Sequence, residues 1–270
     1  MIDMSATLKA GHVLVDGRAA PKRHLLTAGE LVTVDEPVQA PLPEAPDAPY
    51  SVPYGDEHLL VVDKPAGVVV HPARGHRTGT LAQALSPIAA GGEDAARAGI
   101  VHRLDRDTSG LLVVARSEAV HRALRNALQA RAITREYLAL VEGRPPARSG
   151  TIDAPLGRDR RVRTRMSTDS DEPRAAVTHF EIERALPRTT LLRVRLETGR
   201  THQIRAHLRA IEHPVVGDPD YGTPGRLGLE RQFLHAARLA FAHPVTGAAV
   251  DVSSPLPPDL EAALTLAAGE

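Results

Sequence analysis

The chain of 270 residues contains no cysteine and no tryptophan, and aromatic residues make up only 3% of it. The absence of cysteine excludes disulfide bonds, thiolate metal sites and a cysteine nucleophile. The sequence also lacks an apolar run long enough to cross a bilayer, and it does not open with the basic-then-apolar pattern of a signal peptide. We therefore expect a cytoplasmic protein that has no membrane partner.

A net charge is also lacking, because 33 Lys and Arg residues balance 33 Asp and Glu residues. The balance is uneven along the chain. Eight acidic residues and no Lys or Arg lie between Glu30 and Asp63, and four acidic residues and no base lie between Gly247 and Glu270. The remainder therefore has 33 basic against 21 acidic residues, a net charge of about +12. Arginines cluster in two places, Arg158, Arg160, Arg161, Arg163 and Arg165, and Arg122, Arg125, Arg131 and Arg135. Such clusters fit a polyanionic partner or a solvated face of salt bridges, and charge alone favours neither.

The sequence predicts three parts along the chain. Residues 1–36 form short strand-like runs with turns at Asp16-Gly17 and Ala28-Gly29. Residues 37–53 contain six prolines, which excludes a helix or a central strand and predicts an extended linker. Residues 54–270 then form a larger domain, which we expect to carry the functional site.

The larger domain mixes predicted strands with a few helices. Apolar residues recur at helical spacing in residues 118–133 and again in residues 200–211, where Thr201 is the expected N-cap. No regular βαβ rhythm is present, which favours an α+β fold with a mixed, largely antiparallel central sheet and flanking helices. Strand-like patterns occupy residues 58–72 (two strands around a Lys-Pro-Ala-Gly turn), 111–115, 135–143 and 179–199.

Five ionisable residues stand directly before the buried strand that residues 111–115 predict. They are His102, Arg103, Asp105, Arg106 and Asp107. A carboxylate near guanidinium groups stays ionised, which suits a nucleophile or a base better than a general acid. Taken alone, however, Asp105 is more simply explained by a loop ion pair or a turn cap, because both are common.

The stretch HRLDRDTSG, from His102 to Gly110, resembles the signature of the RluA family of pseudouridine synthases. Four further stretches resemble motifs of that family in the same order: DEHLLVVDKPAGVVVHP, ITREYLALVEG, LETGRTHQIRAHL with HPVVGDPDYG, and FLHAARLAFAHPVTG. The similarity covers about residues 49–257 and is greatest to the RluD-type enzymes of large-subunit ribosomal RNA. It implies the pseudouridine synthase fold and an RNA partner, ribosomal RNA by preference and transfer RNA as the alternative.

The resemblance also implies roles for individual residues. Asp105 would be the catalytic carboxylate of an enzyme that detaches uracil from ribose and reattaches it through carbon 5. Tyr137 would stack on the uracil and would help to move a proton, and Arg205 would pair with Asp105. Arg103 would fill the space that the flipped base leaves, with a phosphate contact as its alternative. Whether Asp105 attacks the ribose or removes its 2′ proton stays open.

Weaker predictions concern the surroundings of these residues. The further substrate contacts that we predict are His102, Arg200, His202, Lys64 and His71. Arg200 and His202 stand near a predicted helix start, where backbone N–H groups favour phosphate, and Lys64 and His71 flank the turn of the first motif at the rim of a cleft. The histidines at 202, 207 and 213 do not share one helical face, so we expect no metal site. No phosphate-loop spacing is present, so we expect no cofactor, and we expect a monomer.

Residues 5–34 resemble the second half of the αL-type RNA-binding module that often precedes such catalytic domains. Only a stub of the module's second helix is present, at about residues 4–10, which predicts either a truncated module or a start codon that is assigned too late. Two alternatives to a pseudouridine synthase are a non-enzymatic RNA-binding relative and an unrelated Asp-dependent hydrolase. The intact Asp105, Tyr137 and Arg205 disfavour the first alternative, and the lack of a second paired acid or a metal site disfavours the other.

Overall fold

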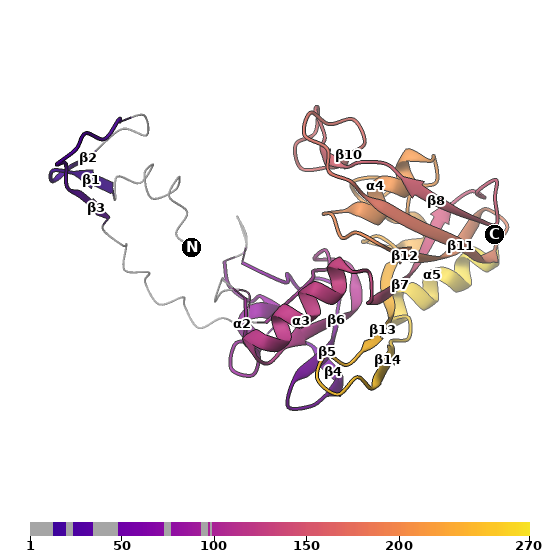
Figure 1. Ribbon diagram of the computed structural model, residues 1–270. Coiled ribbons are helices and arrows are strands. Elements are labelled where there is room, and N and C mark those ends of the chain that lie inside the picture. Colours follow the sequence, from indigo (N-terminus) through magenta and orange to yellow (C-terminus); the bar gives the residue numbers. More distant parts are fainter. Residues whose placement is uncertain (1–12, 20–23, 35–47, 73–76, 93–96, 98) are drawn as a thin grey trace. The chain divides into compact units, whose positions relative to one another are not determined.

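The computed structural model describes residues 13–19, 24–34, 48–72, 77–92, 97 and 99–270 (Figure 1). The chain divides into two compact units, Met1–Ala45 and Pro46–Glu270. The boundary between the units falls inside the proline-rich segment. Within the described residues, no helix is long and apolar enough to span a membrane.

The N-terminal unit contains a small antiparallel sheet with the strand order β2-β1-β3. Asp16 and Gly17 join the first two strands with φ values of 49° and 77°, the left-handed conformation that a tight two-residue hairpin turn needs. The predicted strands and this turn are therefore confirmed. The predicted helical stub at residues 4–10 lies outside the described residues. The strands are β1 (Val13–Val15), β2 (Arg18–Ala19) and β3 (Val32–Val34).

The larger unit is built on one nine-stranded sheet with the order β4-β5-β6-β13-β7-β12-β11-β8, and β14 pairs with β13. The pair β6–β13 is parallel and the other pairs are antiparallel, which confirms the predicted mixed, largely antiparallel sheet. The strands are β4 (Ser51–Gly55), β5 (Leu59–Lys64), β6 (Ser109–Ala115), β7 (Thr134–Glu142), β8 (Ser149–Asp153), β11 (Val177–Ala185), β12 (Thr189–Leu196), β13 (Leu234–Ala242) and β14 (Ala249–Ser253). A separate pair joins β9 (Gly157–Arg158) and β10 (Met166–Ser167).

Strand β6 is buried along its whole length, because helices pack against both of its faces. Leu111 and Val113 pack in one cluster with the apolar face of α3, whereas Leu112 and Val114 pack in another cluster with α2. Burial on both faces explains why this strand is apolar at successive positions. The rigid strand fixes the end of the charged loop that precedes it. The helices are α2 (Leu81–Leu85), α3 (Glu118–Gln129), α4 (Gln203–Ala210) and α5 (Pro258–Ala268), with a 3₁₀ turn η2 (Arg226–Gly228).

Gly110 allows β6 and β13 to run side by side in parallel. Its φ is 111°, and a Cβ atom at this position would lie 2.3 Å from the carbonyl oxygen of Ala236 on β13. A side chain there would meet backbone that cannot swing away. Gly110 therefore holds the strand after the charged loop against the centre of the sheet.

Two local predictions were wrong. The second strand expected in residues 58–72 does not form, since both edges of β5 are occupied by β4 and β6. The carbonyl groups of Val69 and Val70 instead accept hydrogen bonds from the first backbone N–H groups of α2. Thr201 is not the N-cap of α4 either, because the helix begins at Gln203 and His202 occupies the cap position with a φ of 52°.

Candidate active site

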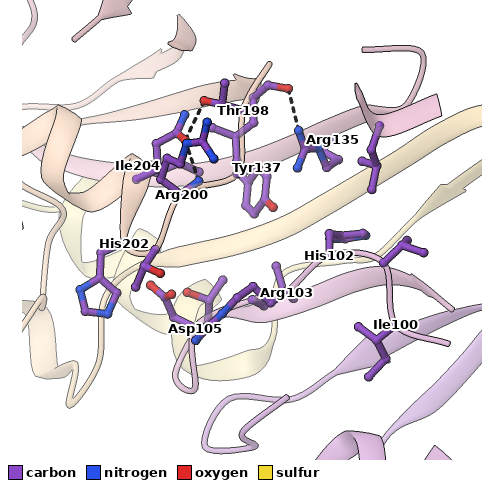
Figure 2. Close-up of a pocket in the computed structure, with 18 of the residues that line it drawn as sticks. Ile100, His102, Arg103, Asp105, Arg135, Tyr137, Thr198, Arg200, His202 and Ile204 are labelled. Carbon is purple, nitrogen blue, oxygen red and sulfur yellow. Dashed lines mark hydrogen bonds between the residues drawn. The ribbon is translucent and has the colours of Figure 1, made fainter. Parts of the chain in front are cut away.

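A cleft of about 640 Å³ opens between the loop before β6, the strand β7 and the start of α4 (Figure 2). These segments are far apart in the sequence and are brought together by the central sheet. Eight of the nine predicted site residues line the cleft, namely Asp105, Tyr137, Arg205, Arg103, His102, Arg200, His202 and His71. The ninth, Lys64, does not line it.

Asp105 and Arg205 meet inside the cleft although 100 positions separate them in the sequence. Nη1 of Arg205 lies 3.2 Å from Oδ2 of Asp105. The Asp105 side chain is 18% exposed and the Arg205 side chain only 4%. The carboxylate therefore faces the cleft, while the guanidinium group behind it is shielded from water.

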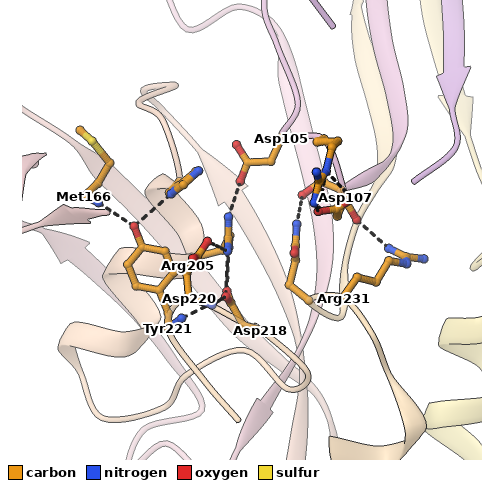
Figure 3. A network of polar contacts seen from close by, with 12 residues as sticks. Asp105, Asp107, Met166, Arg205, Asp218, Asp220, Tyr221 and Arg231 are labelled. Carbon is orange, nitrogen blue, oxygen red and sulfur yellow. Dashed lines mark hydrogen bonds and ion pairs between the residues drawn. The ribbon is translucent and has the colours of Figure 1, made fainter. Parts of the chain in front are cut away.

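Arg205 is itself held by two further carboxylates (Figure 3). Asp218, whose side chain is fully buried, accepts hydrogen bonds from Nε at 2.7 Å and from Nη2 at 2.8 Å. Asp220 accepts a second bond from Nη2, also at 2.8 Å. Burial lowers the pKa of Arg205, but the bonds to Asp218 and the charge of Asp105 outweigh it and raise the pKa above its ordinary value. This side chain therefore acts as a fixed cation.

Asp218 and Asp220 both lie in the stretch HPVVGDPDYG, but nothing in the sequence around them marks either as a partner of Arg205. The same stretch supplies Tyr221, whose ring centroid lies 5.0 Å from the guanidinium carbon of Arg205. Burial raises the pKa of Tyr221 to about 12. Its hydroxyl oxygen accepts a hydrogen bond from the backbone of Met166 at 2.7 Å and lies 3.1 Å from Nδ1 of His202. The turn at residues 218–221, which follows α4, thus supplies three side chains that contact Arg205.

Tyr137 enters the cleft from β7 and is only 5% exposed. Burial raises the pKa of its hydroxyl, so the phenol keeps its proton at neutral pH. Arg135, two positions earlier on the same strand, is also buried and also lines the cleft. Glu136 between them points to the opposite face of the sheet, where it contacts Arg238 at 3.3 Å.

Two buried basic side chains bind the backbone of the loop that precedes β6 and carries Asp105, which we call the Asp105 loop. Nζ of Lys64 donates to the carbonyl groups of Pro65 at 2.8 Å and Arg106 at 2.9 Å. Nη1 of Arg231 donates to the carbonyl group of Asp107 at 3.0 Å. Lys64 is completely buried, so its predicted place at the cleft rim was wrong. Burial of its amine lowers the pKa of Lys64 to about 7.

The remaining predicted contacts lie around the mouth of the cleft. Arg103 is exposed on the Asp105 loop, and His71 is partly buried. Arg200 is exposed, and its Nε donates to the carbonyl group of Ala175 at 3.0 Å. Burial lowers the pKa of His202, which favours a neutral ring. In the described part of the chain, no group of three or more His, Asp or Glu side chains is arranged to hold a metal ion.

Known proteins share both this fold and the sequence that builds the cleft. Residues 58–210 match the family model described as RNA pseudouridylate synthase. The chain is 44% identical over 272 residues to "Ribosomal large subunit pseudouridine synthase D" of Xanthomonas campestris, which covers 96% of this chain and 82% of that protein. It is 49% identical over 265 residues to an "Uncharacterized RNA pseudouridine synthase" of Chloroflexus aurantiacus, with 95% and 82% covered.

Among solved structures, "Human RNA Pseudouridylate Synthase Domain Containing 1" superimposes with a TM-score of 0.62 at 28% identity, covering 80% of this chain and 88% of that one. The architecture around the cleft is thus the pseudouridine synthase fold. The chain belongs to the RNA pseudouridylate synthase family, as an enzyme of the RluD type that isomerises RNA.

Proposed function

We propose that this protein converts specific uridines of large-subunit ribosomal RNA to pseudouridine, with Asp105 as the catalytic carboxylate. The observation that carries the proposal is the contact of 3.2 Å between Asp105 and the buried Arg205, in a cleft that Tyr137 also lines. The name of the Xanthomonas relative supports ribosomal RNA as the substrate. The exposed Arg103 on the same loop suits a side chain that replaces a flipped base.

The reaction requires one bond to break at the ribose and another to form. The bond from C1′ to N1 breaks, the base turns, and C5 bonds to C1′ while the proton on C5 leaves and N1 takes one up. Attack of a carboxylate on C1′ and removal of the 2′ proton both need an oriented carboxylate next to the ribose. Arg205 supplies that orientation for Asp105. A Tyr137 phenol that keeps its proton suits stacking and hydrogen-bond donation rather than service as a ready base.

The decisive experiment maps pseudouridine in large-subunit ribosomal RNA from cells that have the protein, lack it, or carry only Asp105→Asn. We expect discrete positions to lose pseudouridine both in the cells that lack the protein and in the cells with Asp105→Asn. Restored modification with Asp105→Asn would remove Asp105 from the mechanism. Losses confined to transfer RNA would replace the proposed substrate.

We also propose a domain arrangement in which residues 1–36 are a truncated αL-type module, a linker follows it, and the catalytic domain of a monomeric, cytoplasmic enzyme begins earlier than residue 54, because residues 51–53 of the predicted linker 37–53 belong to β4. The proline content of the linker supports this division. Deletion of residues 1–45 should leave a folded enzyme whose RNA affinity changes only a few-fold, about 1 kcal/mol. Binding of full chain and deletion to the same RNA at fixed salt checks this, and a hundredfold loss would mean that the N-terminal unit binds RNA strongly.

A further inference from the structure

Arg135 is a buried cation in the cleft for which the proposed mechanism has no use. It is 7% exposed, and its Nη2 donates long hydrogen bonds of 3.4 and 3.3 Å to the carbonyl groups of Leu196 and Glu197. Its buried Nε has no hydrogen-bond partner, and within the described residues no carboxylate pairs with it. Burial of a charge without an opposite charge or full hydrogen bonding is unfavourable, and a guanidinium group does not shed its proton.

His102 contributes a second unused donor beside Arg135. The backbone N–H of Val113 donates to Nε2 of His102 at 3.2 Å, so Nε2 is the acceptor and carries no proton. Burial and then the charge of Arg135 lower the pKa of His102 to about 3, so the ring is neutral and its proton sits on Nδ1. Nδ1 is buried and also has no partner within the described residues.

The two unused donors lie on the side of Tyr137 that is remote from Asp105. Figure 2 shows Asp105 on one side of the Tyr137 ring and both Arg135 and His102 on the other. Arg135 and Tyr137 are two residues apart on β7 and face the same way, so their Cα atoms are roughly 7 Å apart. A base stacked on Tyr137 with its ribose at Asp105 would therefore direct the edge opposite its glycosidic bond toward Arg135.

We propose that Arg135 and His102 form a donor-only subsite that binds the O4 carbonyl oxygen of the target uracil. In uracil, C4 stands opposite N1 across the ring, so O4 points directly away from the ribose. The inference rests on the proposed stacking of the base on Tyr137. A phosphate is a poorer match, because Arg135 is only 7% exposed and the flipped base is the group that enters deepest.

The chemistry of the subsite agrees with the reaction and with the choice of base. Cytosine has an amino group in place of O4, and that donor would oppose the donors of Arg135 and His102. When the bond from C1′ to N1 breaks, its electron pair stays on the base and spreads to O2 and O4, where a guanidinium group stabilises it. After the ring turns to place C5 at C1′, O2 occupies the position that O4 held. The same donors therefore serve substrate and product.

The test combines two changes, replacement of O4 of the uracil by sulfur and replacement of Arg135, and asks whether their effects on the rate are independent. Large-subunit ribosomal RNA is transcribed with uridine or with 4-thiouridine, both tritiated at C5, and tritium release is followed with enzyme in excess. Sulfur is a weak acceptor, so wild type should slow by about tenfold or more on the thio RNA. Arg135→Met should be slower by about tenfold or more on ordinary RNA, yet should lose at most about twofold further on thio RNA.

Arg193→Gln is the matched control. It lies on β12 with its side chain on the opposite face of the same sheet, paired with Glu183 at 2.7 Å. This variant should retain both the wild-type rate and the wild-type sensitivity to sulfur. Arg135→Lys keeps the charge but not the planar donor geometry of the guanidinium group, so it should recover part of the rate. It serves as the test variant if Arg135→Met has a much lower melting temperature.

Equal slowing by sulfur in wild type and Arg135→Met would overturn the proposal, as would an Arg135→Met rate equal to that of wild type. A variant that reaches the wild-type rate at saturating RNA but binds with a weaker salt dependence would place a phosphate at Arg135, and would also overturn it. If wild type leaves ribosomal transcripts unmodified, the proposed substrate fails, and transfer RNA transcripts then carry the same comparison.

Discussion

At one end of the cleft Arg205 contacts three carboxylates, whereas at the other end Arg135 contacts two backbone carbonyl groups and, within the described residues, no carboxylate. Both guanidinium groups are buried, so the difference lies in their partners and not in their exposure. A cation that has four of its five donors engaged by carboxylates of the protein serves as a scaffold. A cation with unused donors in a cleft serves as a receptor for an acceptor that arrives with the substrate.

The two arginines also differ in their effect on the stability of the free protein. Removal of one partner from a buried ion pair costs about 3–5 kcal/mol, because the other charge is left unpaired. A buried donor without a partner costs about 1–3 kcal/mol in the free protein. The Arg205 end therefore adds rigidity to the free enzyme. The Arg135 end carries a cost that a bound carbonyl oxygen relieves.

The largest expected effect is at Asp105, the proposed catalytic carboxylate, which lines the cleft beside Arg205. Asp105→Asn should lower the rate of tritium release by about a thousandfold or more while RNA affinity changes only a few-fold. Asp107→Asn is the matched control, because Asp107 pairs with Arg106 at 2.9 Å outside the cleft. Single-turnover kinetics of both variants check the contrast. Similar rates for the two variants would contradict the assignment of Asp105.

Replacement of Arg205 should have the next largest effect. Arg205→Ala should lower turnover by about a hundredfold or more, with a much smaller change in RNA affinity, because its partner is the proposed catalytic carboxylate and not the RNA. It should also lower the melting temperature, since the fully buried Asp218 is left unpaired. Arg205→Lys should rescue turnover only in part. A normal turnover number with weaker RNA binding would make Arg205 a phosphate contact.

Lys64 is another buried basic side chain, and unlike Arg205 and Arg135 it can lose its charge. Burial lowers its pKa from 10.5 to about 7, so between these values the unfolded chain binds the additional proton. Lys64 therefore destabilises the fold below about pH 7, and this penalty is relieved as the pH rises toward 10.5. The melting temperature of wild type minus that of Lys64→Met should increase between about pH 6 and pH 9. A difference that is constant with pH would show that Lys64 titrates normally.

The smallest effect concerns arginines outside the cleft. Arg161 and Arg163 are exposed, and within the described residues their side chains form no ion pair, whereas Arg160 pairs with Asp169 at 3.1 Å and Asp171 at 2.9 Å. Replacing Arg161 and Arg163 with Gln should make the slope of log RNA affinity against log salt concentration less steep by about one to two. The position of the modified uridine should not change. Arg160→Gln should change the slope less. An unchanged slope in the double variant would make this cluster a solvated face.

Much of the fold and of the site was accessible from the sequence. The apolar run at β6 and the helical spacing of α3 follow from local periodicity, which the structure confirms. The order of the motifs located Asp105, Tyr137 and Arg205, and the structure brings all three to one cleft. The order of the motifs predicts the cleft because it relates residues that are distant in the sequence and adjacent in the fold.

The errors arose where a distant partner decides the outcome. Lys64 was expected at a rim because it flanks the turn of the first motif, but the carbonyl group of Arg106, 42 positions away, makes its burial possible. Asp218 was overlooked because nothing local distinguishes a structural carboxylate from a solvated one. The cap of α4 was misplaced because His202 adopts a left-handed conformation that its residue type does not announce.

The close approach at Gly110 bears on how this enzyme can vary. Gly67 also has a positive φ, 85°, but a Cβ atom there would meet nothing within 4 Å, so Asn could occupy the position at a modest cost. At Gly110 even Ala would have to part β6 from β13. Tolerance of mutation around the cleft is thus decided less by distance from the chemistry than by the room between two backbones. A mutant library of the Asp105 loop should therefore vary residues only up to residue 109 and keep Gly110 unchanged.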